Sequence, residues 1–437
     1  MKVRSFIVIS IFFFISVIIL LLNSWTALSF WPFAQSPAVI SHAHKNIPNN
    51  PLTIFMVTNN YYPYNGGIVS AIESSTQELR KQGHRVYIIT LDFLGTPKAD
   101  DIHASKETDV IRLYCPIKFI YKTNHMALPL HATSDIKKLI VALKPDIIHV
   151  YHPFLLGVCA LRAAQAYTIP IVFTYYTLYE QYAHYVPLPE FLTKPSIRLL
   201  AHSFCNQVKN VIAPSQSLAH YLTTQNSIAS VVIPGGLLPI FERESFAYKP
   251  ESAVFQLMSV SRFAKEKNIY FLLDMYKQLD QARFKLMLIG YGAEEKKLRD
   301  YAYNTLGLSP ENRVFVIKPT KQTLVELYDK ADLFVFASTT ETQGFVLAEA
   351  LARGTPVIAL RGPGVVDIVK DTVNGYIIEN QQDMIKAIQR VSKNKKLHKT
   401  LQYQAWLTGK EYSIALCTTK LLRYYDTVIK NHTMKTN

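Results

Sequence analysis

Short, nearly continuous apolar segments alternate with longer mixed segments along the chain from Leu52 onward. The apolar segments of the first half are rich in β-branched residues. Strands that are buried on both faces of a parallel sheet have this composition. The pattern predicts strands at Leu52–Val57, Arg85–Thr90, Asp109–Tyr114, Ile147–Tyr151, Ile171–Thr174 and Val211–Pro214, with helices at Ile68–Gln82, Ser134–Leu143, Leu155–Ala166 and Ser196–Val208.

The same alternation restarts after Val231-Val232-Ile233-Pro234-Gly235-Gly236. Repeated strand–helix alternation predicts an α/β protein with two Rossmann-like, doubly wound parallel sheets. The tail from Gln382 has three helical stretches, is strongly basic and is expected to pack across both lobes. The second half is predicted to contain strands Ala253–Val260, Phe284–Ile289, Arg313–Ile317, Asp332–Ala337 and Thr355–Leu360, and helices Asn268–Leu279, Ala293–Ala302, Thr323–Lys330 and Val346–Arg353.

The N-terminus carries an apolar run, Phe6–Leu22, which Lys2 and Arg4 precede. A helix that spans a bilayer needs about 20 residues, so we interpret the run as a retained single-pass membrane anchor rather than a shorter, cleavable signal peptide. Lys2 and Arg4 favour a cytoplasmic N-terminus, but charges further along can reverse this orientation, and the side of the membrane stays open. The predicted divisions are an anchor or signal at 1–24, a linker at 25–50, Rossmann-like domains at 51–240 and 241–405, and a C-terminal helix and tail at 406–437.

The charge balance narrows the class of partner. The 437 residues include 47 Lys and Arg against 32 Asp and Glu, a formal net charge of +15. Such a surface attracts lipid headgroups, nucleic acid or phosphorylated small molecules, although scattered solvated lysines would give the same total. No signature of a nucleic-acid-binding domain is present, so no nucleic-acid partner is expected. The four cysteines show no C-x-x-C spacing, and no metal site is expected.

Two loops after predicted strands carry candidate anion-binding groups. Gly66 and Gly67 precede the first helix, where backbone N–H groups of glycines and of a helix N-terminus can approach a phosphate. An ordinary strand–helix turn explains them equally well, and the G-x-G-x-x-G dinucleotide motif is missing. Arg262 and Lys267 follow another strand, where two cations can neutralise a diphosphate leaving group. Solvated loop cations are the alternative.

The most specific motif is Ser338–Ile358, which reads as strand, loop, helix, turn and strand. Glu341 lies in the loop, where it can accept hydrogen bonds from sugar hydroxyls. Gly344 opens the helix, whose free N–H groups can hold phosphate oxygens. Glu349 lies one to two turns into the helix, within reach of a ribose diol; a surface carboxylate is the alternative. Two carboxylates also suggest glycoside hydrolysis, but a residue inside a helix is poorly placed to flank a scissile bond.

These motifs together resemble the two-glutamate signature of retaining family 4 glycosyltransferases, which have the GT-B fold. The matching positions follow the family's order over residues 52–405: Gly66-Gly67, Gly83-His84-Arg85-Val86, Ser261-Arg262 with Lys267, Gly290-Tyr291-Gly292, Glu341 and Glu349. The resemblance implies that the first domain binds the acceptor and the second a nucleotide sugar, often a UDP-sugar. It implies retention of anomeric configuration, with no metal and no cofactor beyond the donor substrate.

The resemblance also assigns roles to individual residues. Arg262 and Lys267 would hold the diphosphate, Glu341 the donor sugar and Glu349 the ribose. Glu341, Arg262 and Lys267 are therefore the candidate catalytic residues of the second domain. The candidate donor-binding set is Gly66, Gly67, Arg262, Lys267, Gly290, Gly344, Phe345, Val346 and Glu349.

Four segments of the first domain are similar to bacterial glucosyl-diacylglycerol synthases: 124–129, 145–149, 153–157 and 174–185. This similarity implies transfer of a hexose, glucose, to a membrane lipid such as diacylglycerol, at a membrane surface. Tyr179 and His184 are the candidate acceptor-binding residues. A soluble or glycan acceptor is the alternative.

One position departs from the pattern of these enzymes. Tyr176 stands where they have a histidine in Thr-Tyr-His-Thr, and it is a candidate catalytic residue. Tyrosine titrates near pH 10 rather than near 6.5, so a weakly active sugar- or lipid-binding protein stays open. His152 and His184 lie nearby in sequence, but a structural role is favoured for both. A nucleotide-dependent oxidoreductase is disfavoured because G-x-G-x-x-G is missing.

Overall fold

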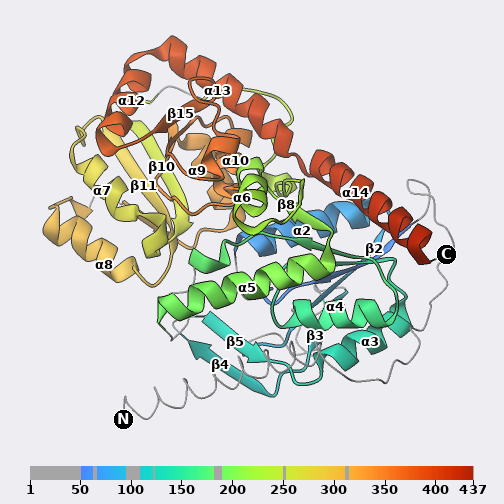
Figure 1. Cartoon of the computed structure of the whole chain (residues 1–437). Coiled ribbons are helices and arrows are strands. Elements are labelled where there is room, and N and C mark those ends of the chain that lie inside the picture. Colours follow the sequence, from blue (N-terminus) through green and yellow to red (C-terminus); the bar gives the residue numbers. More distant parts are fainter. Residues whose placement is uncertain are drawn as a thin grey trace, which may run out of the picture.

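The computed structural model describes residues 51–62, 66–94, 109–121, 124–181, 189–249, 252–310 and 314–436. They form two α/β lobes, the first coloured blue to green and the second yellow to red in Figure 1. The predicted anchor and the linker at 25–50 lie outside the described residues. Among the residues that the structure describes, no helix is both long and apolar enough to cross a bilayer.

The first lobe is built on a parallel sheet of seven strands in the order β3-β2-β1-β6-β7-β8-β9. Helices cover both of its faces, because neighbouring residues of a strand point to opposite sides. The strands are β1 (Thr53–Val57), β2 (Arg85–Leu91), β3 (Val110–Leu113), β6 (Ile147–Val150), β7 (Ile171–Thr174), β8 (Val211–Ala213) and β9 (Val231–Val232). The helices are α2 (Gly67–Lys81), α3 (Ala132–Leu143), α4 (Leu156–Ala166), α5 (Glu190–Val208) and α6 (Gln216–Asn226).

The residues of β1 show how both faces are filled. Ile54 and Met56 pack with apolar residues of α2, whereas Phe55 and Val57 pack with α3, α4 and α5. All four side chains are fully buried. Each such residue contributes roughly 1.5–3 kcal/mol by leaving water, so the strand is fixed between two layers and its carboxyl end is held in place for the loops that follow.

The second lobe has a parallel sheet of six strands in the order β12-β11-β10-β13-β14-β15. Its strands are β10 (Phe255–Arg262), β11 (Phe284–Tyr291), β12 (Phe315–Ile317), β13 (Leu333–Phe336), β14 (Val357–Leu360) and β15 (Gly375–Ile378). Its helices are α7 (Ile269–Lys277), α8 (Glu295–Asp300), α9 (Lys321–Lys330), α10 (Phe345–Ala352), α11 (Val365–Ile368), α12 (Gln381–Lys393) and α13 (Lys395–Gly409). The predicted alternation of strands and helices is confirmed in both lobes.

The structure differs from the sequence expectation in several elements. The predicted helix Ala293–Ala302 is wrong at its ends, because α8 is only six residues long and a π-helical turn, Tyr301–Thr305, follows it. The hairpin of β4 (Ile117–Tyr121) and β5 (Asn124–Leu128) was not predicted. The sequence pattern also missed β9, α6, α11 and β15. Apart from α6 these elements are only two to four residues long, too short to show a period.

The tail packs across both lobes, as predicted. In Figure 1 the last helix, α14 (Ile414–Thr436), runs from the second lobe back over the first. Its Leu421, Leu422 and Tyr425 are buried in the same apolar cluster as β1 and α2. The Tyr425 hydroxyl lies 2.6 Å from Nδ1 of His149. Part of the first lobe's core is therefore supplied by the C-terminus.

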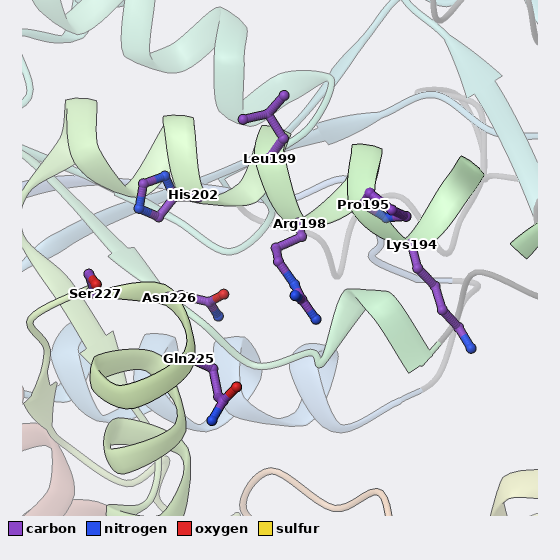
Figure 2. Close-up of a pocket in the computed structure, with 8 residues that line it drawn as sticks. All are labelled: Lys194, Pro195, Arg198, Leu199, His202, Gln225, Asn226 and Ser227. Atoms are coloured by element: carbon purple, nitrogen blue, oxygen red, sulfur yellow. The ribbon is translucent and has the colours of Figure 1, made fainter. Parts of the chain in front are cut away.

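Helix α5 borders a cavity on the outer side of the first lobe. The cavity has a volume of about 430 Å³ and lies between α5 and the end of α6. Figure 2 shows Lys194, Arg198 and His202 of α5 across from the short segment Gln225–Ser227. Arg198 donates two hydrogen bonds to Glu180, at 2.9 and 2.6 Å.

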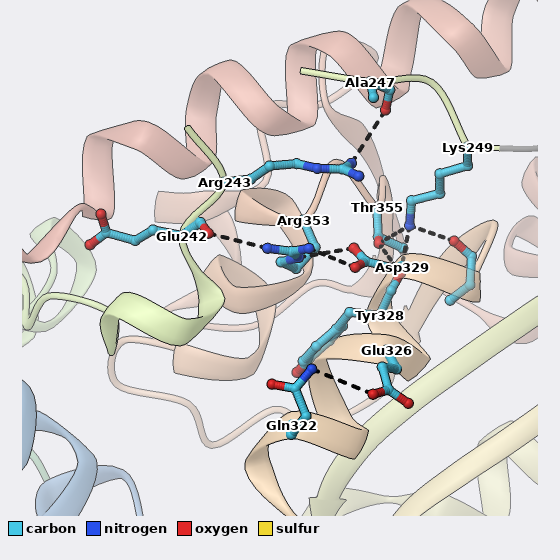
Figure 3. Close-up of polar contacts among 11 residues, drawn as sticks. Glu242, Arg243, Ala247, Lys249, Gln322, Glu326, Tyr328, Asp329, Arg353 and Thr355 are labelled. Carbon is cyan, nitrogen blue, oxygen red and sulfur yellow. Dashed lines mark hydrogen bonds and ion pairs between the residues drawn. The ribbon is translucent and has the colours of Figure 1, made fainter. Parts of the chain in front are cut away.

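The segment after Gly236 belongs to the second lobe. Leu237 and Phe241 are buried in the apolar cluster around β13 and α10. Lys249 Nζ donates to the backbone oxygens of Tyr328 and Ala331, at 2.6 Å each, and to Thr355 Oγ1, as Figure 3 shows in part. Burial lowers the pKa of Lys249 to about 7. These contacts fasten the chain to the second lobe directly after it leaves the first.

Candidate active site

Lys267 and Glu341, 74 residues apart in sequence, form an ion pair at the carboxyl edge of the second sheet. Lys267 closes a short 3-10 helix, Lys265–Lys267, after β10, and Glu341 lies in the loop between β13 and α10. Because β10 and β13 are parallel neighbours, the loops after them lie side by side. Lys267 Nζ lies 2.5 Å from Glu341 Oε1, and the two side chains are 11% and 17% exposed.

The Glu341 carboxylate is kept ionised by its neighbours. Burial by itself would raise its pKa, but the charge and hydrogen bond of Lys267, a hydrogen bond from Ser338 and the charge of Arg262 together hold the pKa below its usual value. Arg262 is the last residue of β10, and its Nη2 lies 3.2 Å from Glu266 Oε1. The predicted carboxylate and both predicted cations therefore converge on one place.

The N-termini of two helices, one from each lobe, meet where Phe345, four residues after Glu341, contacts Gly67. Gly344 precedes α10 with φ of 77°, a left-handed conformation that favours glycine. Phe345 begins α10, and its Cδ2 lies 3.5 Å from the position that a Cβ of Gly67, the first residue of α2, would take. Gly66 precedes α2 in extended conformation, and neither helix has a side-chain cap. Free N–H groups at helix N-termini favour an anion.

Glu349 is buried, so the alternative of a surface carboxylate is wrong. It lies in α10 and is 9% exposed. The Tyr328 hydroxyl of α9 donates to Glu349 Oε2 at 2.8 Å and also contacts the backbone oxygen of Val346 at 3.3 Å. Burial raises the pKa of Glu349 to about 7, more than the Tyr328 hydrogen bond lowers it. Glu349 therefore changes charge close to neutral pH.

Tyr176 lies at the junction of the lobes in a column of aromatic rings. Its ring stacks on Tyr151 with centroids 6.2 Å apart and planes 10° apart, and it meets Phe345 of the second lobe at 6.2 Å. Burial raises the pKa of Tyr176. The hydroxyl is therefore protonated throughout the neutral range, where it can donate a hydrogen bond but cannot act as a base.

Two buried histidines of the first lobe, His149 and His152, are neutral. His149 Nε2 lies 2.6 Å from Thr174 Oγ1, and burial lowers the pKa of His149 to about 3. His152 Nδ1 accepts from the Asn59 backbone N–H at 3.2 Å, and burial lowers its pKa to about 4. The favoured structural role of His152 agrees with this burial. Neither ring supplies a cation to the site at neutral pH.

Gly290 supports the site through the backbone. A Cβ at Gly290, which has φ of 150°, would lie 1.9 Å from the backbone oxygen of Ser261. Only glycine allows this close approach of β11 to the end of β10, where Arg262 begins the site. Its predicted contact with the donor stays a prediction.

Of the two predicted acceptor residues, the structure describes only Tyr179, which packs within the first lobe. Tyr179 packs edge-on against Phe154 and Tyr175, with centroids 5.2 and 5.4 Å apart, at the margin of the first lobe's core. Its hydroxyl faces the backbone oxygen of Tyr151 at 3.5 Å. His184 lies outside the described residues. Acceptor contacts by these two residues stay predictions.

One inter-lobe ion pair was not predicted. Lys321, at the start of α9, places Nζ 2.7 Å from Glu73 Oε2 of α2, which also accepts from the Tyr62 hydroxyl at 2.7 Å. The partners are 248 residues apart, and no local motif marks them. Within the described ranges, no group of three or more His, Cys, Asp or Glu side chains is arranged to hold a metal ion.

Comparison with known proteins identifies the family. Residues 65–237 match glycosyltransferase family 4, and residues 241–406 match the glycosyl transferases group 1 family. An alpha-monoglucosyldiacylglycerol synthase of Streptococcus pneumoniae is 30% identical over 356 residues, which cover 77% of each chain. The chain belongs to glycosyltransferase family 4. A second alpha-monoglucosyldiacylglycerol synthase, from Acholeplasma laidlawii, is 27% identical over 398 residues, which are 85% of this chain and 96% of the relative.

Solved structures show that this glycosyltransferase has the GT-B fold. Sucrose-phosphate synthase of Thermosynechococcus elongatus superposes with a TM-score of 0.68 at 19% identity, over 87% of this chain and all of the other. Anabaena HepE in complex with UDP-glucose superposes with a TM-score of 0.66 at 17% identity, over 86% and 100%. The predicted fold of two Rossmann-like parallel-sheet lobes is confirmed, and so is the enzyme class.

Proposed function

We propose that this glycosyltransferase transfers glucose from UDP-glucose to a membrane lipid such as diacylglycerol, with retention of anomeric configuration. The observation that carries the donor part is the Lys267–Glu341 pair together with the meeting N-termini of α2 and α10. The names of the two curated relatives, both alpha-monoglucosyldiacylglycerol synthases, support the choice of sugar and acceptor.

Each group at the site has a distinct task in this proposal. Lys267 and Arg262 neutralise the diphosphate as it leaves, and the helix N-termini donate N–H groups to its oxygens. Glu341, acceptor-only because it is ionised, holds a hydroxyl of the donor sugar. Glu349 receives the ribose. In this proposal, donor binding exchanges the Lys267–Glu341 ion pair for contacts to phosphate and sugar.

The acceptor hydroxyl approaches from the first lobe. Retention requires that the new bond forms on the face of the sugar from which the diphosphate leaves. The protonated Tyr176 hydroxyl lies beside Phe345 at this junction and can donate a hydrogen bond to substrate oxygens. The Tyr176 hydroxyl cannot accept a proton at neutral pH because it is already protonated. In this scheme the proton of the attacking hydroxyl therefore passes to the leaving phosphate oxygen.

The proposal is tested with the purified full chain, UDP-glucose and diacylglycerol in vesicles. We expect a glucosylated lipid with an α-anomeric linkage, identified by mass spectrometry and NMR. Parallel reactions use other nucleotide sugars and a soluble glycan acceptor. Binding of UDP-glucose without turnover on any of these acceptors would contradict the proposal and favour a weakly active binding protein.

Helix α5 supports action at a membrane surface. Phe191, Leu192 and Leu199 are 75%, 53% and 68% exposed, and Lys194 and Arg198 lie on the same helix. Both cations are in ion pairs, with Glu190 and Glu180, so the exposed apolar side chains, which are typical of a surface that lies on lipid, would make the main contact with the bilayer. Because α5 follows β7, its N-terminal end lies at the carboxyl edge of the first sheet, the edge that faces the site. Together with the predicted anchor, this face would hold the lobe against the bilayer.

Replacing Phe191 and Leu199 with serine is expected to lower transfer to lipid in anionic vesicles by roughly tenfold, the effect of losing about 1.4 kcal/mol of membrane binding. Transfer to the same lipid dispersed in detergent micelles should stay near wild type, because no bilayer is bound there. The matched control is Leu416→Ser, which changes an exposed leucine of α14. Equal losses in vesicles and micelles would show that α5 does not act through the membrane.

A further inference from the structure

The chain passes between the lobes as a buried pair of glycines, Gly235 and Gly236, and the side chain of Gln343 holds the first of them at two points. Gly235 N–H donates to Gln343 Oε1 at 2.9 Å, and Gln343 Nε2 donates to the Gly235 backbone oxygen at 2.7 Å. Gln343 is only 2% exposed. Both polar atoms of this amide are therefore used in one reciprocal contact across 108 residues of sequence.

The glycine pair contacts the first lobe, the second lobe and α14. A Cβ at Gly235 would lie 2.6 Å from both the Phe345 ring of the second lobe and the Tyr176 hydroxyl of the first. A Cβ at Gly236 would lie 2.6 Å from Ile414 of α14. Ser74 Oγ of α2 donates to the Gly236 backbone oxygen at 2.9 Å. The connection between the lobes is thus a packed structural part rather than a loose tether.

The loop that carries Glu341 is fastened to the same junction. Thr342 Oγ1 donates to the backbone oxygen of Tyr176 at 2.6 Å, and Ser215 Oγ donates to the backbone oxygen of Thr342 at 2.5 Å. Gln343 adds the contact to Gly235, and Gly344 then opens α10. Three consecutive residues after Glu341 therefore set where the second lobe's site lies relative to the first lobe.

We propose that Gln343 is a positioning residue for glycosyl transfer, which holds the Glu341–Gly344 loop on the Gly235 connection and so aligns the donor site with the acceptor lobe. This inference rests on the proposed donor role of the loop. The chemical requirement is strict, because the side chain must accept from one backbone N–H and donate to the adjacent carbonyl. An amide does both, whereas an ionised carboxylate only accepts. A misplacement of about 1 Å at a reacting centre can reduce the rate 10²-fold.

The test compares Gln343→Ala and Gln343→Glu with the wild-type full chain, with Gln402→Ala as the matched control. Gln402 is another buried glutamine of the second lobe, 3% exposed. Its amide contacts His398 at 3.2 Å and accepts from the Lys249 backbone N–H at 3.4 Å, and neither contact involves Gly235. For Gln343→Ala we expect kcat to fall by about 10²-fold, from misalignment, while UDP affinity changes by less than about threefold, because the donor diphosphate contacts are kept.

The Gln343→Glu variant gives a readout that a loss of stability would not. At pH 8 its carboxylate faces the Gly235 carbonyl, and activity relative to wild type should be low. As pH falls to 5.5 the relative activity should recover, because a protonated carboxyl accepts through one oxygen and donates through the other, and burial raises the pKa of such a group. Tyr176, which faces Gly235, stays neutral over this range. Asp367, Glu411, Tyr412 and Lys420, which line a cavity with Gln343, are the same in the variant and in wild type, so the activity is compared as a ratio to wild type at each pH.

Hydrogen exchange supplies a readout that does not depend on activity. In Gln343→Ala, protection of segments 233–238 and 341–346 should fall together, and in Gln402→Ala it should not. If both segments keep wild-type exchange in Gln343→Ala, or if the relative activity of Gln343→Glu does not change with pH, the inference is overturned. Loss of the proposed function gives a different result: wild type itself would transfer no sugar, while the exchange comparison would still report on the Gln343–Gly235 contact.

Discussion

Glutamine in place of Glu341 is expected to reduce sugar transfer by about 10²–10³-fold, the range for removing one preorganised electrostatic partner from a reacting site. The amide keeps the size of the side chain and can still accept from Lys267, so the fold should be retained. The variant lacks the negative charge that a low pKa keeps on Glu341 in the folded protein. Alanine at this position would in addition leave the 11%-exposed Lys267 ammonium without its carboxylate, which costs stability.

The matched control is Asp329→Asn, which weakens a partly buried ion pair at the other end of α10. Arg353 donates to the two Asp329 carboxylate oxygens at 2.9 and 2.6 Å (Figure 3). This variant should lower the thermal unfolding midpoint. Transfer should stay within about threefold of wild type, because the Arg353–Asp329 pair stabilises the fold and does not contact the substrate. Initial rates with labelled donor and circular dichroism measure both quantities. If Glu341→Gln were as active as Asp329→Asn, Glu341 would have no role in sugar transfer.

Acid is expected to destabilise the first lobe, because His149 and His152 are buried in neutral form. Their pKa values of about 3 and about 4 lie below the usual value of 6.5. The unfolded chain therefore binds protons that the folded protein excludes, and stability that is fully present above pH 6.5 is lost as pH falls toward the folded pKa values. At pH 5 each histidine should cost about 2 kcal/mol of unfolding free energy relative to pH 8.

The comparison of variants isolates this effect from other titrations. Glu349 acts in the opposite sense, because a carboxyl whose pKa is raised to about 7 loses stability as pH rises through 7. We therefore expect His149→Gln to lose less stability than wild type between pH 8 and pH 5, by about 2 kcal/mol, in chemical denaturation followed by circular dichroism. His220→Gln, at an exposed position of α6, should match wild type. An unchanged acid dependence in His149→Gln would show that His149 does not supply it.

The sequence predicted the fold correctly where consecutive residues of one segment are all buried. Strands such as Ile171–Thr174 match the prediction at both ends, because a segment buried on both faces is apolar at nearly every position. The hairpin β4–β5 was missed: its residues Phe119 and Ile120 are 39% and 58% exposed, so the segment lacks the pattern of a buried strand. The six-residue α8 and its π-helical end depend on packing that no local period encodes.

For the site, the sequence alone selected Glu341, Lys267 and Arg262, because their residue types follow buried strands whose carboxyl ends share an edge. It also placed Gly344 at the helix start, where a left-handed backbone requires glycine. The tertiary structure alone decided that Lys267 and Glu341 pair and that Glu349 is buried.

The same holds for the Gln343 amide, which closes on Gly235 108 residues away. The hydrophobic pattern of a segment indicates which of its own residues are buried. Contacts between segments depend on how two sheets and the returning helix α14 meet, and no single stretch of chain carries that information.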